Sequence, residues 1–466
     1  MNKVLTYLKK TIAFAIIVSL VFGIVSFSPV RAKAAVTSSG NIARGIDVSK
    51  YQGVINWPAV AASGVKFAFL RIGTTLGGMD PTFMYNIQQA QANGIKVGVY
   101  IYSYATNVEQ ATFEAMCTIT WLENYGLQLP VVFDIEDKCH SKLDPVTLAA
   151  IINTYCILID SAGYYPMIYT YKNFYQTKIG VSPWDKWMAQ YNDSLNTNEG
   201  VAFWQYSSSG SVPGINTRVD MDYQYKDYSN LIIPEGFIAH NGGTRFYLNW
   251  KMQKGWISYQ DKKYLADALG NIQKGWFTDV DGKTYFFDMA TGAACTGPTD
   301  IMGFKFYFDE QGAQKTGFID YGQGNKYFDP LANGAMVCGW FAYNGTMHYA
   351  DESGNQVIGF KNIDGADYFF KEDGSVAMNE PVEVNGVMYN ADATGVLIPV
   401  PIVPEITDPT SVQDGGTADG QAAVPEYIVD PATGLALETA TGNWINQSTG
   451  EIVATAADVA KALSAN

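Results

Sequence analysis

Short apolar runs alternate with amphipathic stretches along residues 42–228. Eight of the runs have the length and the β-branched and aromatic content of β-strands. They read GIDVSKY, FAFLRIG, KVGVYIYSY, PVVFDIE, YPMIYTY, KWMAQY, VAFWQYS and VDMDYQY. Strand, helix and strand at this spacing predict parallel βα units. We therefore expect an α/β fold, a modified TIM-like βα barrel whose helices are shortened or missing in the later half.

Three stretches between the early strands have the periodicity of amphipathic helices. They cover residues 80–93, 108–125 and 145–162. An Asp-Pro pair opens the first and the third stretch, which predicts an N-cap followed by a first-turn proline at Asp80 and Asp144. Gly94 and Gly163 stand where these two helices are expected to stop.

After Gly236 the rhythm of the sequence changes to a repeat. Glycines recur at steps of 20, 22, 20, 22 and 20 residues, and a second series runs in step with the first. The first series is Gly255, Gly275, Gly297, Gly317, Gly339 and Gly359, and the second is Gly270, Gly292, Gly312, Gly334, Gly354, Gly374 and Gly395. Each unit reads as two short strands with an aromatic cluster. One hairpin cannot bury these side chains alone, so an all-β solenoid of stacked hairpins is predicted over residues 236–400.

The two ends of the chain differ in composition from the rest. Residues 1–34 carry lysines, then a long apolar stretch, then Ala32-Lys33-Ala34. This order predicts a secretory signal peptide; a retained membrane anchor is the alternative, since the apolar stretch approaches spanning length. Residues 401–466 are acidic and rich in Pro, Gly and Ala, which predicts a flexible tail.

The net charge and the numbers of Cys and His limit the kinds of site that the chain is expected to contain. The formal net charge is −15, and nine acids against one base in the tail account for about half of it. A nucleic-acid partner is not expected, because phosphate binding needs clustered Lys and Arg. The five cysteines match no zinc spacing and make no disulfide framework in a chain of this size, and only three histidines exist. No metal or cofactor is predicted, and the chemistry is expected to run on carboxylates.

Acids stand at or near the ends of three predicted strands. Asp134 and Glu136 close PVVFDIE, and residues two apart in a strand point to the same face, about 6.5–7 Å apart. Asp47 lies in the first strand, and Asp220 and Asp222 lie in the last. Because barrel enzymes place their chemistry at the C-terminal ends of strands, these acids are expected to converge on one rim. Mutual repulsion raises the proton affinity of such a cluster, which suits a general acid that protonates a glycosidic oxygen.

Aromatic and polar side chains near the same strand ends are candidates to hold a sugar. A single Tyr or Trp at such a position is more often part of the core, so each of them is a weak signal alone. The residues predicted to bind the substrate are Arg71, Tyr100, Tyr102, Tyr169, Gln190, Trp204, Tyr206 and Asp222.

The motifs GIDVSKYQGVINW, FAFLRIG, PVVFDIED, WMAQY, FWQYSSSGSVPGI and VDMDY, in unbroken order, resemble glycoside hydrolase family 25. Members of that family are muramidases, or lysozymes, which cut the β-1,4 bond after N-acetylmuramic acid in peptidoglycan. The resemblance implies a catalytic barrel over residues 35–230. It also implies Glu136 as the catalytic acid, Asp134 as its partner in the D-x-E motif, and Asp47 and Asp220 as the acids of the first and last strands.

The resemblance leaves part of the mechanism open. The partner acid Asp134 either orients the 2-acetamido group of the substrate for attack or stabilises the charge that develops on the sugar. The sequence does not choose between a retaining and an inverting reaction, because the separation of the carboxylates decides it. Many family members have a His in the third-strand aromatic motif where this chain has Tyr102. This departure concerns contacts with the sugar and leaves the acids unchanged.

The repeats resemble the choline-binding-like repeats that hold wall hydrolases on bacterial cell walls. In choline binders a Trp after Gly and aromatic residues of the next hairpin enclose a quaternary ammonium. Phe318 and Phe360 replace that Trp in some units, so the polymer is either a choline-bearing teichoic acid or another wall glycan. The residues predicted to bind it are Trp256, Trp276, Trp340, Tyr285, Tyr307 and Tyr327.

Together these features predict a secreted peptidoglycan hydrolase, an autolysin-type N-acetylmuramidase that its repeats hold on the wall of a Gram-positive-type bacterium. No stable membrane insertion is expected after the signal peptide is cleaved. Two alternatives stay open. One is a wall-bound glycan-binding or adhesin protein with an inactive hydrolase domain, and the other is the same fold cutting after N-acetylglucosamine.

Overall fold

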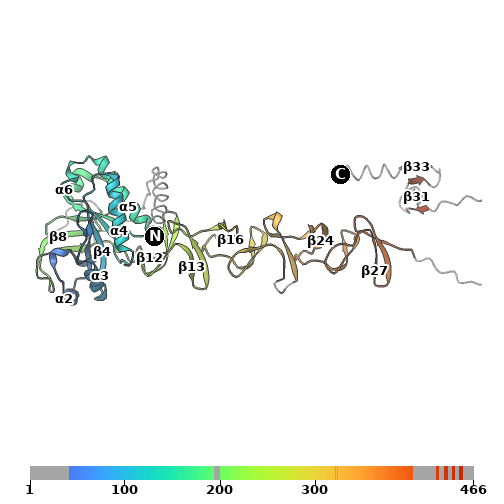
Figure 1. Cartoon of the computed structure of the whole chain (residues 1–466), viewed down its shortest axis with the longest axis horizontal. Helices are drawn as coiled ribbons and strands as arrows, with labels where there is room; N and C mark the ends of the chain where they lie inside the picture. The colour runs from blue at the N-terminus through green and yellow to red at the C-terminus, as the bar shows by residue number, and fades with distance from the viewer. Residues whose placement is uncertain are drawn as a thin grey trace, which may run out of the picture. The chain divides into compact units, whose positions relative to one another are not determined.

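The computed structural model describes residues 41–193, 200–320, 322 and 324–401, together with four strands within residues 427–454 (Figure 1). The predicted signal peptide at residues 1–34 lies outside the described residues. The chain divides into two compact units, Met1–Ile398 and Pro399–Asn466. Among the described residues, no helix combines the length and the apolar character needed to cross a membrane.

Eight strands close into a barrel in the first unit. They are β1 (Ala43–Val48), β2 (Phe67–Thr74), β4 (Lys96–Tyr102), β5 (Val131–Asp134), β6 (Pro166–Tyr171), β7 (Asp185–Ala189), β8 (Phe203–Gly210) and β9 (Val219–Gln224). Their order is β1-β9-β8-β7-β6-β5-β4-β2, and the pairing of β1 with β2 closes the ring. The short β3 (Gly78–Met79) forms an antiparallel edge on β2. The predicted barrel is confirmed.

One barrel strand runs against the others. β9 is antiparallel to both β8 and β1, whereas the other neighbouring barrel strands are parallel. A parallel connection needs a crossover of about a dozen residues or more. The segment 211–218 between β8 and β9 is shorter than that, so the last strand returns as a hairpin.

Helices cover the strands of the early half. They are α2 (Trp57–Ala62), α3 (Phe83–Ala92), α4 (Val108–Leu122) and α5 (Pro145–Ser161), with short 3-10 turns η1 (Lys50–Gln52) and η2 (His140–Lys142). After β6 there follow only α6 (Lys172–Phe174) and the π-helical turn η3 (Tyr175–Ile179). The described residues between β7 and β9 contain no helix. The later half therefore has the shortened helices that the sequence predicts.

The two predicted helix caps have different outcomes. Asp144 accepts hydrogen bonds from the backbone N–H groups at the start of α5, at 2.9 and 3.0 Å, as expected for an N-cap. The prediction for Asp80 is wrong, because α3 begins only after Thr82. The Asp80 carboxylate uses one oxygen, Oδ2, for a charged pair with Arg71, and its other oxygen accepts from Thr82 N–H at 3.0 Å, one residue before the helix begins.

Alternating residues of the barrel strands form two apolar layers, one on each face of the sheet. One layer fills the barrel interior with Phe67, Phe69, Val132, Met167, Trp187 and Phe203. The other lies between the strands and the helices and includes Ile46, Leu70, Val99, Phe133, Ile168 and Met188. Phe69 stacks on Trp187 at 4.6 Å between ring centroids. A Cβ at Gly45 or Gly98 would overlap a phenylalanine ring. The interior is therefore packed solid below the C-terminal strand ends.

The repeat region is a series of hairpins. Among the described residues, seven hairpins follow β10 (Glu235–His240), β11 (Gly243–Leu248) and β12 (Lys251–Met252). They pair β13 (Gly255–Tyr259) with β14 (Lys262–Ala266), β15 (Gly275–Thr278) with β16 (Thr284–Phe287), β17 (Gly297–Ile301) with β18 (Phe304–Phe308), β20 (Gly317–Asp320) with β21 (Asn325–Asp329), β23 (Gly339–Tyr343) with β24 (Thr346–Ala350), β25 (Gly359–Ile363) with β26 (Ala366–Phe370), and β27 (Glu380–Val384) with β28 (Val387–Ala391). Three of these hairpins gain a short third strand, which is β19 (Gln314–Lys315), β22 (Ala335–Met336) or β29 (Leu397–Pro399). Each glycine of the first series opens a hairpin.

Neighbouring hairpins bury their aromatic residues against one another. The cluster of Tyr285, Phe287 and Ala313 also includes side chains of the preceding hairpin. The segments after several hairpins bond back to the previous one, as in the 2.8 Å bond from Ala294 N–H to Lys263 O and the 2.9 Å bond from Val376 N–H to Met347 O. Glycines of the second series have positive φ, and a Cβ at Gly374 would overlap the preceding unit. The predicted solenoid is confirmed.

The β10–β12 segment contacts helices α4 and α5 of the barrel. His240 Nε2 lies 2.9 Å from Asp160 Oδ2, Arg245 donates to Asp160 O at 2.8 Å, and Lys251 donates to Glu123 O at 2.7 Å. These contacts are at the C-terminal ends of the helices, which is the end of the barrel where the strands begin. The repeats therefore start on the side away from the C-terminal strand ends.

The second unit contains a four-stranded antiparallel sheet, so the prediction of a flexible tail is wrong for these residues. Its strands are β30 (Tyr427–Val429), β31 (Leu435–Glu438), β32 (Asn443–Asn446) and β33 (Glu451–Ala454). Each strand is short but contains β-branched or aromatic residues, or leucine, and a Thr-Gly pair precedes the last three in the sequence. The acidic, Pro- and Ala-rich composition of the whole segment favoured a flexible tail, so these short strands were not predicted.

Candidate active site

Carboxylates gather at the C-terminal mouth of the barrel. Strand pairing places Asp47 opposite Asp220, and it places Asp222 opposite Gly45. Asp134 is in register with Tyr169 on the next strand. In-register residues of neighbouring strands point to the same face, so these acids project into the barrel above its aromatic interior. The predicted convergence of the three strand ends is confirmed.

Glu136 reaches the same space from just outside the strand. β5 ends at Asp134, so the prediction that Glu136 is a strand residue is wrong. The chain stays extended there because Ile135 N–H donates to Tyr169 O at 2.9 Å, and Tyr171 hydroxyl donates to Glu136 O at 3.0 Å. Burial raises the pKa of Glu136, while the hydroxyl of Tyr169 opposes the rise and the carboxylate of Asp220 adds to it.

The cluster holds protons more tightly than isolated carboxyl groups do. Burial raises the pKa of Asp47, Asp134 and Asp222 well above the ordinary value. Repulsion adds to the effect, from Asp222 and Asp220 on Asp47 and from Glu136 on Asp134. Burial also raises the pKa of Asp220, to about 6. The site therefore holds protons to a higher pH than isolated carboxyl groups do, and a general acid must have such a proton available.

Asp134 presents an oxygen toward the site. Its side chain is buried, and its Oδ1 has no hydrogen-bond partner among the described residues. A buried acceptor without a partner is costly in a folded protein, and a catalytic role is one of the reasons for which such a group is retained.

A glutamine that the sequence did not single out organises the acids. Gln205 Nε2 donates to Asp47 Oδ2 at 2.7 Å, and its Oε1 accepts from the hydroxyls of Tyr169 and Tyr191 at 2.9 and 3.0 Å. Gln205 lies two residues after Phe203, so it faces the same interior. A polar residue on the inward face of the predicted strand VAFWQYS was the available signal.

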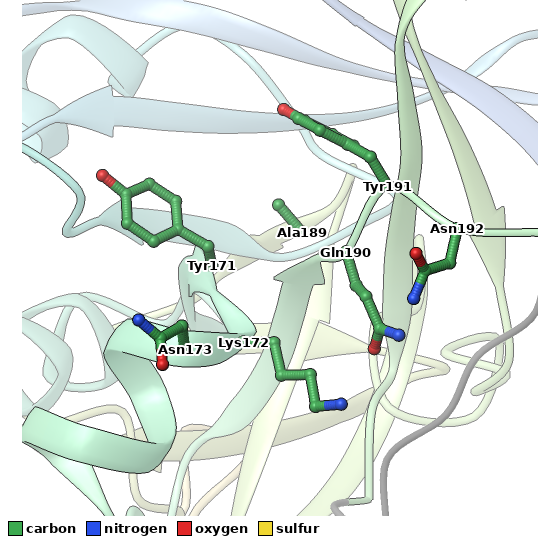
Figure 2. Close-up of a pocket in the computed structure, with 7 residues that line it drawn as sticks. All are labelled: Tyr171, Lys172, Asn173, Ala189, Gln190, Tyr191 and Asn192. Atoms are coloured by element: carbon green, nitrogen blue, oxygen red, sulfur yellow. The ribbon is translucent and has the colours of Figure 1, made fainter.

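A pocket of about 390 Å³ opens at the ends of β6 and β7, beside the acids (Figure 2). The predicted substrate-binding residue Gln190 is part of its wall. The residues that line it are Tyr171, Lys172, Asn173, Ala189, Gln190, Tyr191 and Asn192.

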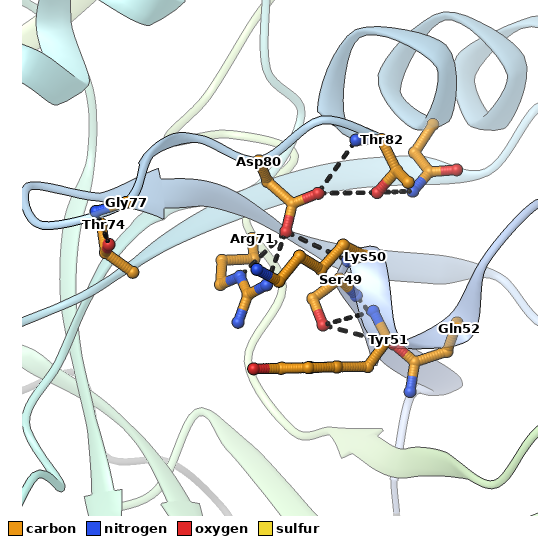
Figure 3. Close-up of polar contacts among 10 residues, drawn as sticks. Ser49, Lys50, Tyr51, Gln52, Arg71, Thr74, Gly77, Asp80 and Thr82 are labelled. Carbon is orange, nitrogen blue, oxygen red and sulfur yellow. Dashed lines mark hydrogen bonds and ion pairs between the residues drawn. The ribbon is translucent and has the colours of Figure 1, made fainter.

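A second rim element stands at the end of β1 (Figure 3). Arg71 donates to Asp80 Oδ2 through both Nε and Nη2, at 2.9 and 2.7 Å, and Lys50 N–H donates to the same oxygen. The ring of Tyr51 covers the guanidinium group of Arg71 at 5.0 Å and remains 70% exposed. Tyr51 was not among the predicted site residues, although it stands at the end of the predicted strand GIDVSKY, where an aromatic residue was a visible signal. Arg71 also lowers the pKa of Asp134, against the effect of burial.

Several predicted substrate-binding residues lie elsewhere. The prediction that Trp204 and Tyr206 bind substrate is wrong. Phe203 and Gln205 face the barrel interior, so the alternating residues Trp204 and Tyr206 face outward. Trp204 packs in the layer under the helices, and Tyr206 stacks on Tyr223 at 4.3 Å.

Three further predicted residues face inward but lie too deep to form an open surface. Tyr100 and Tyr169 are buried in the aromatic interior. Asp222 is fully buried and accepts a hydrogen bond from Trp187 Nε1 at 2.8 Å, so its prediction as a substrate contact is wrong. Tyr102, in contrast, is partly exposed and donates to Asp137 Oδ2 at 3.2 Å.

Three tryptophans of the repeats are exposed and rest on aromatic residues of the next hairpin. Trp256, Trp276 and Trp340 are 48%, 43% and 37% exposed. Trp256 lies 5.0 Å from Tyr285, Trp276 lies 5.0 Å from Phe306, and Trp340 lies 4.9 Å from Tyr368.

Two predicted repeat residues occupy other places. Tyr327 is buried against Phe341, with the rings stacked at 4.6 Å, so it belongs to the core between hairpins. Tyr307 lies 6.0 Å from Phe328, and its neighbour Phe306 is the residue that meets Trp276. The alternation along β18 decides which of the two faces the tryptophan.

The described part of the chain contains no group of three or more His, Cys, Asp or Glu able to hold a metal ion. The five cysteines form no disulfide bond with one another.

Comparison with known proteins matches two families. Residues 46–215 match the family described as "Glycosyl hydrolases family 25", and residues 358–376 match the "Putative cell wall binding repeat". The uncharacterized protein YegX of Escherichia coli K12 is 31% identical over 208 residues, which cover 42% of this chain and 74% of that protein. The autolytic lysozyme of Clostridium acetobutylicum is 27% identical over 203 residues, covering 43% and 60%. Lysozyme M1 of Streptomyces globisporus is 29% identical over 197 residues, covering 38% and 66%.

Proposed function

The chain belongs to glycoside hydrolase family 25, and from that premise we propose that it is a secreted N-acetylmuramidase. It would hydrolyse the β-1,4 bond between N-acetylmuramic acid and N-acetylglucosamine in peptidoglycan, as a lysozyme-type autolysin. The observation that carries this proposal is the cluster of proton-retaining carboxyl groups around Glu136 and Asp134 at the barrel mouth. Two similar proteins are named as lysozymes, which supports this choice of bond.

Glu136 is the proposed general acid. Burial raises its pKa, so it holds its proton to a higher pH than an ordinary glutamic acid does. Its side chain is not fully covered, so it can reach the glycosidic oxygen. Protonation of the leaving oxygen while the bond breaks is the step that such a carboxylic acid accelerates. Tyr171 supports it by holding the Glu136 carbonyl.

Asp134 is the proposed partner of Glu136. Its unpartnered Oδ1 would accept the N–H of the 2-acetamido group or stabilise the positive charge that develops on the sugar. Both roles need an acceptor in the same place. Asp47 and Asp220 complete the cluster, and their charge keeps the proton affinity of the site high.

The cleaved bond can be read from the sugar left at the reducing end of the products. Purified peptidoglycan digested with this enzyme, reduced with borohydride and analysed by mass spectrometry is expected to yield fragments that end in reduced N-acetylmuramic acid. Fragments that end in reduced N-acetylglucosamine would identify a glucosaminidase and overturn the proposed bond. A reference muramidase and a reference glucosaminidase run on the same wall calibrate both outcomes.

We further propose that the repeats hold the enzyme on a wall polymer. Supporting this are the exposed tryptophans, each backed by aromatic residues of the next hairpin, and the match to a cell-wall-binding repeat. A binding region joined to a catalytic one raises the local concentration of the enzyme at its substrate.

Changing Trp256, Trp276 and Trp340 to Ala together is expected to lower the fraction bound to sedimented walls by about tenfold or more, since each exposed aromatic contributes roughly 0.5–2 kcal/mol. The rate on soluble glycan oligomers should stay the same. Phe113→Ala, which removes a more exposed aromatic residue on α4 outside the repeats, is the control. Unchanged sedimentation of the triple variant would contradict the anchoring proposal, and binding that survives excess choline would exclude a choline-dominated site.

A further inference from the structure

The pocket at the ends of β6 and β7 differs in chemistry from the acid cluster beside it. None of the described residues that line it is acidic, and four of them carry N–H donors, namely Lys172, Asn173, Gln190 and Asn192. The rest of the lining is formed by two tyrosine rings and Ala189. Lysine donates and never accepts, and each amide offers two donors. The pocket is therefore suited to a group that accepts hydrogen bonds and carries negative charge.

The pocket is continuous with the catalytic groups through its two tyrosines. The Tyr171 hydroxyl donates to the carbonyl of Glu136 at 3.0 Å, and the Tyr191 hydroxyl donates to Gln205, which in turn holds Asp47. In Figure 2 both tyrosine rings extend away from the ends of the Lys172 and Gln190 side chains. The tyrosine side of the pocket thus adjoins the reacting groups, and the donor side lies away from them.

The acid cluster and the pocket beside it differ in how they interact with an anionic part of the substrate. The mouth of the barrel concentrates carboxyl groups, so an anionic substituent of the substrate meets repulsion there. Across the mouth, the guanidinium group of Arg71 is already paired with Asp80. Muramic acid carries a short peptide on its lactyl group, and this stem peptide has free carboxylates. An anionic stem is best accommodated where a cation and amide donors replace the acids.

We propose that this pocket binds a free carboxylate of the stem peptide, with Lys172 as its charged contact and Asn173, Gln190 and Asn192 as neutral donors. The proposal rests on the proposed muramidase function and names a feature of its substrate. The enzyme then prefers glycan whose stems are charged over glycan whose stems are neutral, and the pocket sets KM rather than the rate of bond cleavage.

The test compares two soluble probes of the same size. Both are glycan oligomers with stem peptides released from bacterial wall; in one the stem carboxylates are free, and in the other they are converted to methylamides. Lys172→Gln is expected to raise KM about fivefold on the free-carboxylate probe, with kcat unchanged and with no effect on the methylamide probe. Lys178→Gln, in the same segment but outside the pocket lining, is the matched control and should match wild type on both probes.

Other variants separate a local effect from misfolding. Lys172→Arg should retain the preference for charged stems, and Asn192→Asp should weaken it by adding a repelling charge at the donor side. Equal losses of Lys172→Gln on both probes would show that the pocket holds the glycan itself and would overturn the proposal. So would equal KM values of the wild type on the two probes. If the wild-type enzyme cuts neither probe, the muramidase proposal fails and this inference fails with it.

Discussion

Replacement of Glu136 by glutamine is expected to lower kcat on peptidoglycan by about 10³-fold or more, with the fold and wall binding unchanged. Glutamine has the shape of the acid but no proton to give to the glycosidic oxygen, so the step that breaks the bond loses its proton donor. The rate is measured as the release of reducing ends from purified wall. Wild type and variant are compared at equal amounts of wall-bound enzyme.

Glu109→Gln provides the matched control, because it is the same substitution on the exposed first turn of α4. It should retain the wild-type rate. If Glu136→Gln and wild type release reducing ends equally slowly, the barrel is inactive and the chain is a wall-bound glycan-binding protein. This experiment therefore separates the enzyme from its main rival.

The pH profile offers an independent check on the same residue. Burial raises the pKa of Glu136, and only its protonated form can act as the acid. Activity should accordingly fall as the pH rises through that raised pKa. A decline shifted to higher pH than for an ordinary glutamic acid is the expected signature.

The sequence predicted those features that depend on local periodicity. Strand runs with alternating apolar residues located the barrel strands, and the spacing of glycines located every hairpin from Gly255 to Gly359. The acids Asp47, Asp134 and Asp220 were found because strand ends of a barrel share one rim. These features follow from residues close together in the sequence and from one general rule, that barrel strands end at a common rim.

The missed features depend on partners far away in the sequence. Gln205 and Asp47 are 158 residues apart, so no local pattern shows that one holds the other. Asp80 resembles a helix cap until the fold brings Arg71 next to it. The error at Trp204 has a different source. The strand was predicted correctly, but its inward-facing residues were not identified as Phe203 and Gln205. In the tail, composition outweighed a weak strand pattern.

Removal of the Asp222 charge is expected to stabilise the barrel. Asp222 is fully buried, and its raised pKa means that the folded protein holds this proton more tightly than the unfolded chain does. The resulting stability is present below the ordinary pKa of 3.8 and is lost as the pH rises through the folded-state value. Above that value the folded protein carries a buried charge, and between the two values it holds a proton that the unfolded chain releases.

Asp222→Asn avoids that cost and retains the main contact. Its amide oxygen can accept from Trp187 Nε1 as Oδ1 does, and its amide nitrogen can donate to Asp47, which already interacts with Asp222. We expect the free energy of unfolding at pH 8 to rise by on the order of 1–3 kcal/mol, with a smaller gain at pH 5. Urea denaturation of both proteins at the two pH values measures the difference.

Asp227→Asn, on the segment that follows β9, is the control. The same substitution there is expected to have the opposite effect on stability, because the pKa of Asp227 is lowered rather than raised. Backbone and side-chain hydrogen bonds from Ser229 lower the pKa of Asp227, so its charge contributes stability at neutral pH and its removal should not stabilise the barrel. A gain at Asp222 that is equal at pH 5 and pH 8 would show that packing, not charge, is responsible. A loss at both would mean that the buried carboxyl group supports the fold, and the acid cluster would then not be a source of strain.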